Sequence, residues 1–228
     1  MNEVLAVDLG TVDYRQAWDL QRQLVERRAA DDVPDLLLLL EHPHVITLGR
    51  RGTMADVLDR SVPVVEVERG GEATYHGPGQ LVGYPIMKLA DRLDVRKYVR
   101  NLEEVLICAS QAFGVPTGRD SRQSGVWVHG HKLGSIGVAI HRNVTYHGFA
   151  HNVNTDLGYF SKIRPCGFDA SIMTSMQREL GRPVAMEDFR DAVAKSFGDV
   201  LARPLAWTGL ETLGARAPPE PLPPSPPQ

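Results

Sequence analysis

The stretch Val126-Trp127-Val128-His129-Gly130-His131-Lys132-Leu133-Gly134-Ser135-Ile136-Gly137-Val138-Ala139-Ile140 predicts a β-hairpin. Residues 126–129 and 132–140 are dominated by β-branched and small apolar residues, which suit strands. Gly130 stands between them, where a tight turn needs a residue without a side chain. Residues 145–153 form a further β-rich run directly after the hairpin. This part of the chain is therefore expected to be mostly sheet.

Helices and further strands are expected on both sides of this β-rich region. Apolar residues at helical spacing predict helices at 13–28, 94–113 and 186–201, and Asp13 with Gln16 resembles a capping box at the first of them. The expected further strands are 36–40, 45–48 and 62–67, with a turn at 42–44 joining the first two. Strands and helices alternate without a strict βαβ order, which favours an α+β (mixed α/β) fold.

Length and composition favour one folded domain. The chain has 228 residues, 43% of them hydrophobic, and a net charge of -3 that gives no support for nucleic-acid binding. We expect a catalytic domain at 1–212 and a tail at 213–228 that is rich in proline and disordered. The tail is expected to be dispensable, although a proline-rich segment can also bind an aromatic groove.

The composition also bears on location. No apolar run approaches the ~20 residues of a membrane helix, and the N-terminus lacks the features of a signal peptide. Two cysteines, Cys108 and Cys166, are too few for a disulfide framework. A cytoplasmic location is therefore expected.

The block Arg69-Gly70-Gly71-Glu72-Ala73-Thr74-Tyr75-His76-Gly77-Pro78-Gly79-Gln80 is a candidate binding loop. Four glycines within ten residues allow the backbone to approach a ligand closely and to present N–H groups to an oxyanion or carbonyl. Arg69 and His76 add directional donors. The spacing matches neither the P-loop nor the dinucleotide-binding motif. A simple glycine-rich turn between two strands remains the alternative.

Cys166 is a candidate nucleophile and Lys132 a candidate base. Cys166 lies between Pro165 and Gly167, which fix the backbone on one side and leave it open on the other, whereas Cys108 lies on an apolar helix and reads as a small buried residue. A thiol with a pKa of ~8.5 needs a base to become a thiolate. A desolvated lysine in a strand of small and apolar residues is such a base. The alternative for Lys132 is a solvent-facing side chain at a hairpin edge.

Histidines at positions 147 and 151 raise the question of a metal site. In a helix this spacing would place both rings on one face, but the segment is expected to be extended, which sets the two residues far apart. No third ligand is evident. We therefore expect no metal.

Several blocks together resemble the lipoyl(octanoyl) transferase family, and they cover about residues 1–210. The matching blocks are Leu39-Leu40-Glu41-His42-Pro43 with Thr47-Leu48-Gly49-Arg50, Arg69 to Pro85, Gly125-Val126-Trp127-Val128, Lys132 to Gly137, Tyr146 to Asn154, and Pro165-Cys166-Gly167 with Thr174-Ser175. A single block would be weak evidence. Their common order along the chain makes the resemblance specific.

The resemblance implies a fold shared with biotin and lipoate protein ligases, in which helices flank a mixed sheet. It implies a catalytic dyad of Cys166 and Lys132 that transfers an octanoyl or lipoyl group from acyl carrier protein to a lysine of lipoyl domains, through an acyl-enzyme and without a cofactor. The implied protein substrates are the lipoyl domains of 2-oxoacid dehydrogenase complexes and the glycine cleavage H protein. The implied substrate-binding residues are Arg69, Gly70, Gly71, Glu72, Ala73, Thr74, Tyr75, His76, Ser135, Ile136, Gly137, Gly148, Phe149 and Ala150.

Basic residues near these blocks could guide an acidic carrier protein to the site. They are Arg50, Arg51, Arg69, Lys162 and Arg164, and scattered surface charge is the alternative interpretation. Three other activities also remain open from the sequence: an ATP-dependent ligase on the same fold, a non-catalytic binding module for lipoyl domains or acyl chains, and a cysteine hydrolase.

Overall fold

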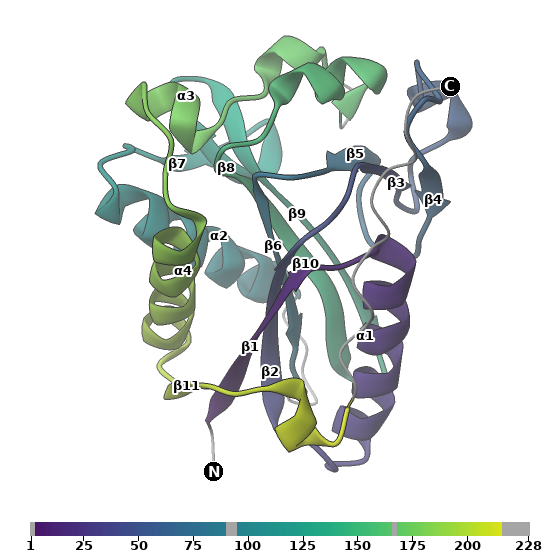
Figure 1. Ribbon diagram of the computed structural model, residues 1–228, viewed down its shortest axis with the longest axis vertical. Coiled ribbons are helices and arrows are strands. Elements are labelled where there is room, and N and C mark those ends of the chain that lie inside the picture. Colours follow the sequence, from purple (N-terminus) through teal and green to yellow (C-terminus); the bar gives the residue numbers. More distant parts are fainter. Residues whose placement is uncertain (1–2, 90–94, 166–167, 216–228) are drawn as a thin grey trace.

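A mixed sheet of eight strands forms the centre of the computed structural model, which describes residues 3–89, 95–165 and 168–215 (Figure 1). The strand order is β11-β1-β2-β6-β10-β9-β8-β7. β1 pairs in parallel with β2 and β11, and all other pairs in this sheet are antiparallel. The strands are β1 (Val4–Thr11), β2 (Asp35–Glu41), β6 (Gln80–Ile86), β7 (Gly118–Asp120), β8 (Gln123–Val128), β9 (His131–His141), β10 (Val144–Asn152) and β11 (Leu205–Trp207).

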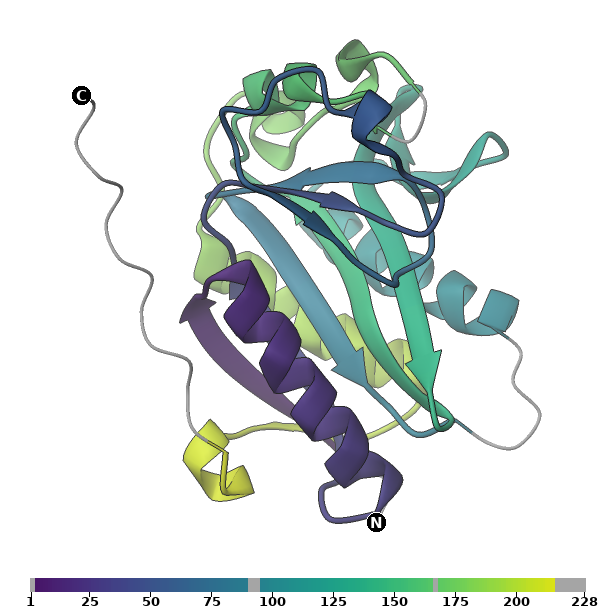
Figure 2. The ribbon, with the colours of Figure 1, turned by 90° about the vertical axis from the view of Figure 1, so that its right-hand side faces the viewer.

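Helices cover both faces of this sheet, as two perpendicular views show (Figures 1 and 2). Helix α1 (Tyr14–Ala29) packs on one face, and α2 (Val95–Ala112) and α4 (Met186–Leu201) pack on the other. Alternate side chains of β2 enter the two cores, because successive strand residues point to opposite faces. Leu36, Leu38 and Leu40 belong to the core under α1, while Leu37 and Leu39 belong to the core under α2 and α4. Burial on both faces explains the uninterrupted leucine run.

A second, smaller sheet lies beside one end of the first. It consists of β4 (Val64–Glu66), β3 (Val45–Leu48) and β5 (Ala73–His76), in that order. The turn predicted at 42–44 therefore joins strands of two different sheets. His42 anchors this turn, since its ring is fully buried, donates from Nδ1 to the Val12 carbonyl (2.6 Å) and accepts from the Tyr84 hydroxyl (2.8 Å).

The predicted helix boundaries hold, with one correction at the first helix. Asp13 caps α1 by accepting from the backbone N–H groups of Arg15 and Gln16. The reciprocal half of the predicted capping box does not form, because the Gln16 side-chain oxygen is buried without a hydrogen-bond partner among the described residues. Helix α4 spans the predicted residues, and α2 begins at Val95 next to a segment, 90–94, outside the described residues.

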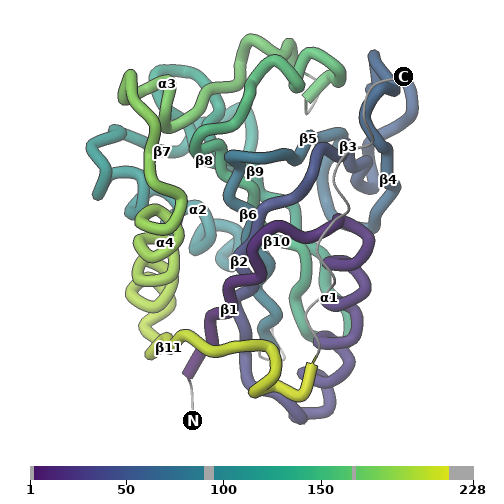
Figure 3. Tube along the Cα trace, viewed as in Figure 1, coloured from purple at the N-terminus to yellow at the C-terminus, as the bar shows by residue number. Residues whose placement is uncertain are grey.

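The chain between β10 and α4 crosses from the small sheet to the main one (Figure 3). It contains η2 (Leu157–Lys162), η4 (Ala170–Ile172) and α3 (Met176–Leu180). Ile163 forms an isolated bridge with Val57, which follows η1 (Met54–Asp56), and Met173 forms another with Lys132 on β9. These two bridges therefore attach the segment to the chain after η1 and to β9.

The folded part of the chain extends slightly past the predicted domain boundary at 212. Leu210 and Leu213 of η5 (Leu210–Leu213) are buried in the core under α1, and Ala215 packs against it. Most of the predicted tail, 216–228, lies outside the described residues. Among the residues that the structure describes, no helix has the length and apolar character needed to cross a membrane.

Candidate active site

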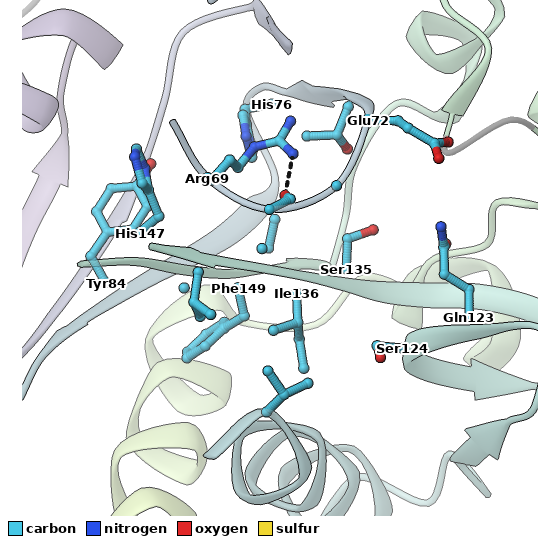
Figure 4. A pocket seen from close by; sticks show the side chains of 18 of the residues that line it. Arg69, Glu72, His76, Tyr84, Gln123, Ser124, Ser135, Ile136, His147 and Phe149 are labelled. Atoms are coloured by element: carbon cyan, nitrogen blue, oxygen red, sulfur yellow. Dashed lines mark hydrogen bonds between the residues drawn. The ribbon is translucent and has the colours of Figure 1, made fainter. Parts of the chain in front are cut away.

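A cavity of about 320 Å³ is lined by the β9–β10 strands, the glycine-rich loop and the start of α2 (Figure 4). Figure 4 shows Arg69, Glu72 and His76 on the loop side, with Ile136 and Phe149 on the other side of the strands. The cavity is lined by Tyr14, Arg51, Arg69, Gly70, Gly71, Glu72, Thr74, His76, Tyr84, Val95, Val99, Gln123, Ser124, Lys132, Ser135, Ile136, Gly137, Val138, His147, Gly148, Phe149 and Ala150.

The two strands supply all six of the predicted substrate-binding residues that lie on them. Gly137 of β9 pairs with Gly148 of β10, and the loop is hydrogen-bonded to β9 from Gly70 N to the Val138 carbonyl (3.0 Å). A side chain at Gly137 would collide with the loop, because its Cβ would lie 2.8 Å from the Gly70 carbonyl oxygen. Glycine at this position therefore lets the loop approach the sheet closely.

The glycine-rich loop contributes six of its eight predicted residues to the cavity. Ala73 and Tyr75 do not line it: both are fully buried in a separate core with the small sheet. They alternate along β5 with Thr74 and His76, which do face the cavity. The pleat of the strand separates the two sets.

Arg69 holds the loop in place from inside the protein. Its Nη2 donates to the carbonyl and hydroxyl oxygens of Thr47 (both 2.8 Å), and its Nη1 donates to the Gly70 carbonyl (3.0 Å). Only 8% of Arg69 is exposed, so it belongs to the cavity wall rather than to an outer basic rim. Lys162 is ion-paired with Asp59. The other three predicted rim residues, Arg50, Arg51 and Arg164, are exposed.

His76 begins a buried chain of hydrogen bonds that ends at the backbone of Lys132. Its Nδ1 donates to Gln80 Oε1 (2.8 Å), and Gln80 Nε2 donates to Asn152 Oδ1 (2.9 Å). Asn152 in turn donates to the Thr174 carbonyl (3.0 Å), and Thr174 N donates to the Lys132 carbonyl (3.0 Å). Burial, aided by nearby His42 and Arg69, lowers the pKa of His76 well below its usual value. The ring is therefore neutral at pH 7.

Lys132 lies within the protein and not at a solvent-facing hairpin edge. It is 2% exposed and lines the cavity. Its amine donates a hydrogen bond to Gln123 Oε1 and lies 5.5 Å from the centre of the Trp127 ring. This environment is the desolvated one that the sequence interpretation requires for a basic amine.

Cys166 and Gly167 lie outside the described residues, but the chain on both sides of them is placed. Upstream, Arg164 N donates to the Asp56 carbonyl (2.9 Å). Downstream, the Phe168 ring meets Trp127 edge-on at 6.3 Å, and Met173 pairs with Lys132 itself. The other cysteine, Cys108, is half-buried on α2 and does not line the cavity, and burial raises the pKa of its thiol.

His147 and His151 turn toward different elements. His147 has a left-handed backbone (φ 52°), lines the cavity and packs on Tyr146, whereas His151 stacks on Phe189 of α4 and contacts Ser110 (3.1 Å). The positive φ at His147 breaks the strand alternation that would have put both rings on one face. In the described part of the chain, no group of three or more His, Cys, Asp or Glu side chains could hold a metal ion.

Sequence reasoning missed several residues of the cavity wall. The missed residues are Tyr14, Tyr84, Val95, Val99, Gln123, Ser124, Val138 and His147 as a lining residue. Arg51, which was predicted as a rim residue, also lines the cavity. His147 could have been predicted as a lining residue, because it precedes Gly148, which the family resemblance placed at the substrate site. It had been interpreted only as a possible metal ligand. Gln123 gave no signal of this kind, because a polar residue at the start of a strand is unremarkable until its partner is known.

The fold defined here is that of the lipoate and biotin protein ligases. A bipartite lipoate protein ligase from Thermoplasma acidophilum superposes with a TM-score of 0.72 at 16% identity, over 93% of this chain and 91% of that one. A biotin protein ligase from Leishmania major, in complex with biotinyl-5-AMP, gives 0.53 at 9% identity, over 90% and 77%. The predicted fold class is confirmed.

Residues 13–198 match the family model of the lipoyl protein ligase A/B catalytic domain, and the chain belongs to this family. It is 49% identical over 213 residues to an octanoyltransferase of Mycobacterium leprae, covering 90% of each chain. The resemblance seen in the sequence and the expected class of enzyme, an octanoyl-transferring acyltransferase, are thereby confirmed.

Proposed function

We propose that the chain moves an octanoyl or lipoyl group from the thioester of acyl carrier protein to a lysine of lipoyl domains, through a thioester on Cys166. Lys132 carries the proposal: it is a buried amine in the cavity wall, and its strand pairs with the segment that follows Cys166. The segment that begins at Phe168, two residues after Cys166, is therefore connected to the strand that carries Lys132.

The proposed reaction has two balanced steps. Lys132 takes the Cys166 proton, and the thiolate attacks the thioester carbonyl; the new carbon–sulfur bond replaces the bond to the carrier's thiol, which leaves with a proton from the ammonium. The lysine of a lipoyl domain then attacks the acyl-enzyme. Its amide bond forms, one amine proton is lost to a base, and the Cys166 thiolate is released. A thioester is converted to an amide, so ATP is not consumed.

The acyl chain is proposed to lie along β9 and β10. Ile136, Val138 and Phe149 give this wall its apolar character, together with Val95 and Val99. Each buried methylene contributes about 0.8 kcal/mol to binding. The glycine-rich loop lies on the other side of these strands, and its backbone N–H groups are candidates for holding the oxyanion.

The proposed protein partners are an acidic acyl carrier protein and the lipoyl domains of 2-oxoacid dehydrogenase complexes and of the glycine cleavage H protein. Arg50, Arg51 and Arg164 are exposed and can meet an acidic carrier. A cytoplasmic location, where carrier and lipoyl domains meet, belongs to the same proposal.

Mass spectrometry of the intact protein and its peptides tests the function. After incubation with octanoyl-carrier protein and no ATP, we expect one octanoyl group on the peptide containing Cys166, and its loss on addition of a lipoyl domain, which becomes octanoylated. Cys108→Ala should behave as the wild type and Cys166→Ala should show no adduct.

Three results would overturn the proposal. An adduct that persists in Cys166→Ala would move the nucleophile elsewhere. Product that forms only with ATP would indicate a ligase, and free octanoate released faster than transfer would indicate a hydrolase.

A further inference from the structure

We propose that Gln123 is a positioning residue that holds the amine of Lys132 in its reactive orientation and stabilises it after it has taken a proton. This inference rests on the proposed function of the Cys166–Lys132 pair. Gln123 lines the same cavity and accepts a hydrogen bond from the Lys132 amine through its Oε1.

The path of the Lys132 side chain depends on a glycine of β8. Gly125 has φ of 137°, and a Cβ there would lie 3.0 Å from Lys132 Cε and 2.4 Å from the Gly134 carbonyl oxygen. The lysine therefore runs across the bare backbone of Gly125 to reach Gln123. A larger residue at 125 would obstruct this route.

Gln123 is itself held in place. Its backbone carbonyl accepts a hydrogen bond from the Trp127 indole N–H (3.0 Å), and it pairs with Asp120 of β7 in the sheet. The centre of the Trp127 ring lies 4.6 Å from the Arg122 guanidinium, 5.5 Å from the Lys132 amine and 6.3 Å from the centre of the Phe168 ring. Phe168 is two residues after Cys166. One ring thus connects the amine, its amide partner and the chain next to the cysteine.

The chemistry of an amide oxygen suits this role. An amide oxygen only accepts hydrogen bonds, so it binds one N–H of the neutral Lys132 amine. The lone pair of the lysine nitrogen then points elsewhere, toward an incoming proton. Once Lys132 has taken the thiol proton, the same contact becomes charge-assisted and roughly twice as strong. Gln123 therefore favours the thiolate–ammonium pair over the neutral pair.

Other charged groups near the amine are fixed by their own partners. Arg51, Arg69 and Glu72 line the cavity from the loop side, and Arg51 lies 3.5 Å from Glu72. From α2, Glu103 accepts from Gly125 N (3.0 Å) and is paired with both Arg100 and Arg119. None of these groups changes in the variants below.

The test is the rate of Cys166 acylation by octanoyl-carrier protein, measured in single turnovers across pH. Gln123→Met keeps the side-chain length but removes the acceptor, so acylation should slow by about tenfold or more. The pH range in which the thiolate–ammonium pair exists should also narrow. Without the acceptor, the ammonium loses its proton at a lower pH and the thiol loses its proton at a higher pH. Gln123→Glu adds a negative charge, which favours both the ammonium and the protonated thiol, so the range should move to higher pH.

A matched substitution controls for a general loss of packing. The Gln111 side chain donates to the Thr117 carbonyl (3.0 Å) away from the cavity, and Gln111→Met should keep the wild-type rate and pH limits. If both Gln123 variants also keep the wild-type pH limits, the inference is wrong, whatever their rates. If the wild type forms no adduct at Cys166, the proposed function fails first, and the two failures are thus distinguishable.

Discussion

Lys132 places its amine in the protein interior, where lysine is rarely found. Its stem lies among strands and its amine among the polar groups of a cavity wall. Burying the amine costs solvation free energy. Folding stability alone gives no reason to bury it. A side chain in this position is therefore a candidate for chemistry.

Replacing Lys132 by methionine should separate catalysis from stability. We expect Lys132→Met to lower single-turnover acylation by about a hundredfold or more, because the thiol loses its base. The free energy of unfolding should stay the same or rise, because an apolar side chain replaces a buried amine. Acylation kinetics and urea denaturation measure the two effects.

Lys195→Met is the control for this change. Lys195 is 79% exposed and pairs with Asp199 at the surface, so its loss should affect neither quantity appreciably. Equal acylation by Lys132→Met and the wild type would remove Lys132 from the mechanism.

At the scale of elements, the β9–β10 strands and the loop above them form one unit. At Gly137 there is no room for a side chain, because a Cβ atom would lie 2.8 Å from the Gly70 carbonyl oxygen. Gly137→Val should push the loop away from β9 and break the bond from Gly70 to Val138. We expect KM for octanoyl-carrier protein to rise about tenfold or more, since the walls of the acyl site no longer fit.

Steady-state kinetics together with thermal unfolding tests this prediction. Gly118→Ala is the control, because Gly118 on β7 has open space around it and should tolerate a methyl group. An unchanged KM in Gly137→Val would show that the loop does not form the acyl site.

Gln80 connects three elements through its amide, with partners on β5 and β10. Gln80→Leu leaves buried groups of His76 and Asn152 without partners, at about 1–3 kcal/mol each in unfolding free energy. Gln80→Glu can still accept from His76, but it buries a carboxylate against the Asn152 Oδ1 and the Tyr75 carbonyl, so it should lose at least as much at neutral pH. Urea denaturation of both variants measures the two losses; a smaller loss in Gln80→Glu would contradict the prediction.

At the scale of the whole molecule, buried neutral histidines make stability depend on pH. Burial lowers the pKa of His42 to about 4 and those of His147 and His151 to about 3. The unfolded chain binds these protons from about pH 6.5 downward, so stability is fully present above that pH and falls toward pH 4. Within this pH range, each histidine lowers the free energy of unfolding by about 1.4 kcal/mol for each pH unit of acidification.

Urea denaturation at pH 7, 6 and 5 measures this slope. His151 packs between α2 and α4 away from the cavity, so His151→Gln should remove its share of the slope and leave the acyl site intact. A slope that is the same in this variant and the wild type would assign the pH dependence to other groups.

Elements with strong local signals were predicted closely. Helix α4 and strand β3 have the predicted bounds, because an apolar period of 3.6 or a short β-branched run depends only on near neighbours. The half-formed capping box shows the limit of such signals. Asp13 caps its helix locally, while Gln16 is turned into a buried site that the motif cannot foresee.

The amino-acid sequence by itself determined the three long helices, several of the strands and the family, since the helices and strands follow from residues close along the chain and the family from motifs read in order. It did not predict β1, β6 or β11. The tertiary structure alone decided that Lys132 is buried against Gln123, that Tyr75 faces away from the cavity and that β2 and β3 belong to different sheets. Burial and hydrogen-bond partners depend on side chains distant in sequence, such as Gln80 and Asn152, 72 positions apart. Folding brings these together by packing, and local patterns do not specify which side chains will meet.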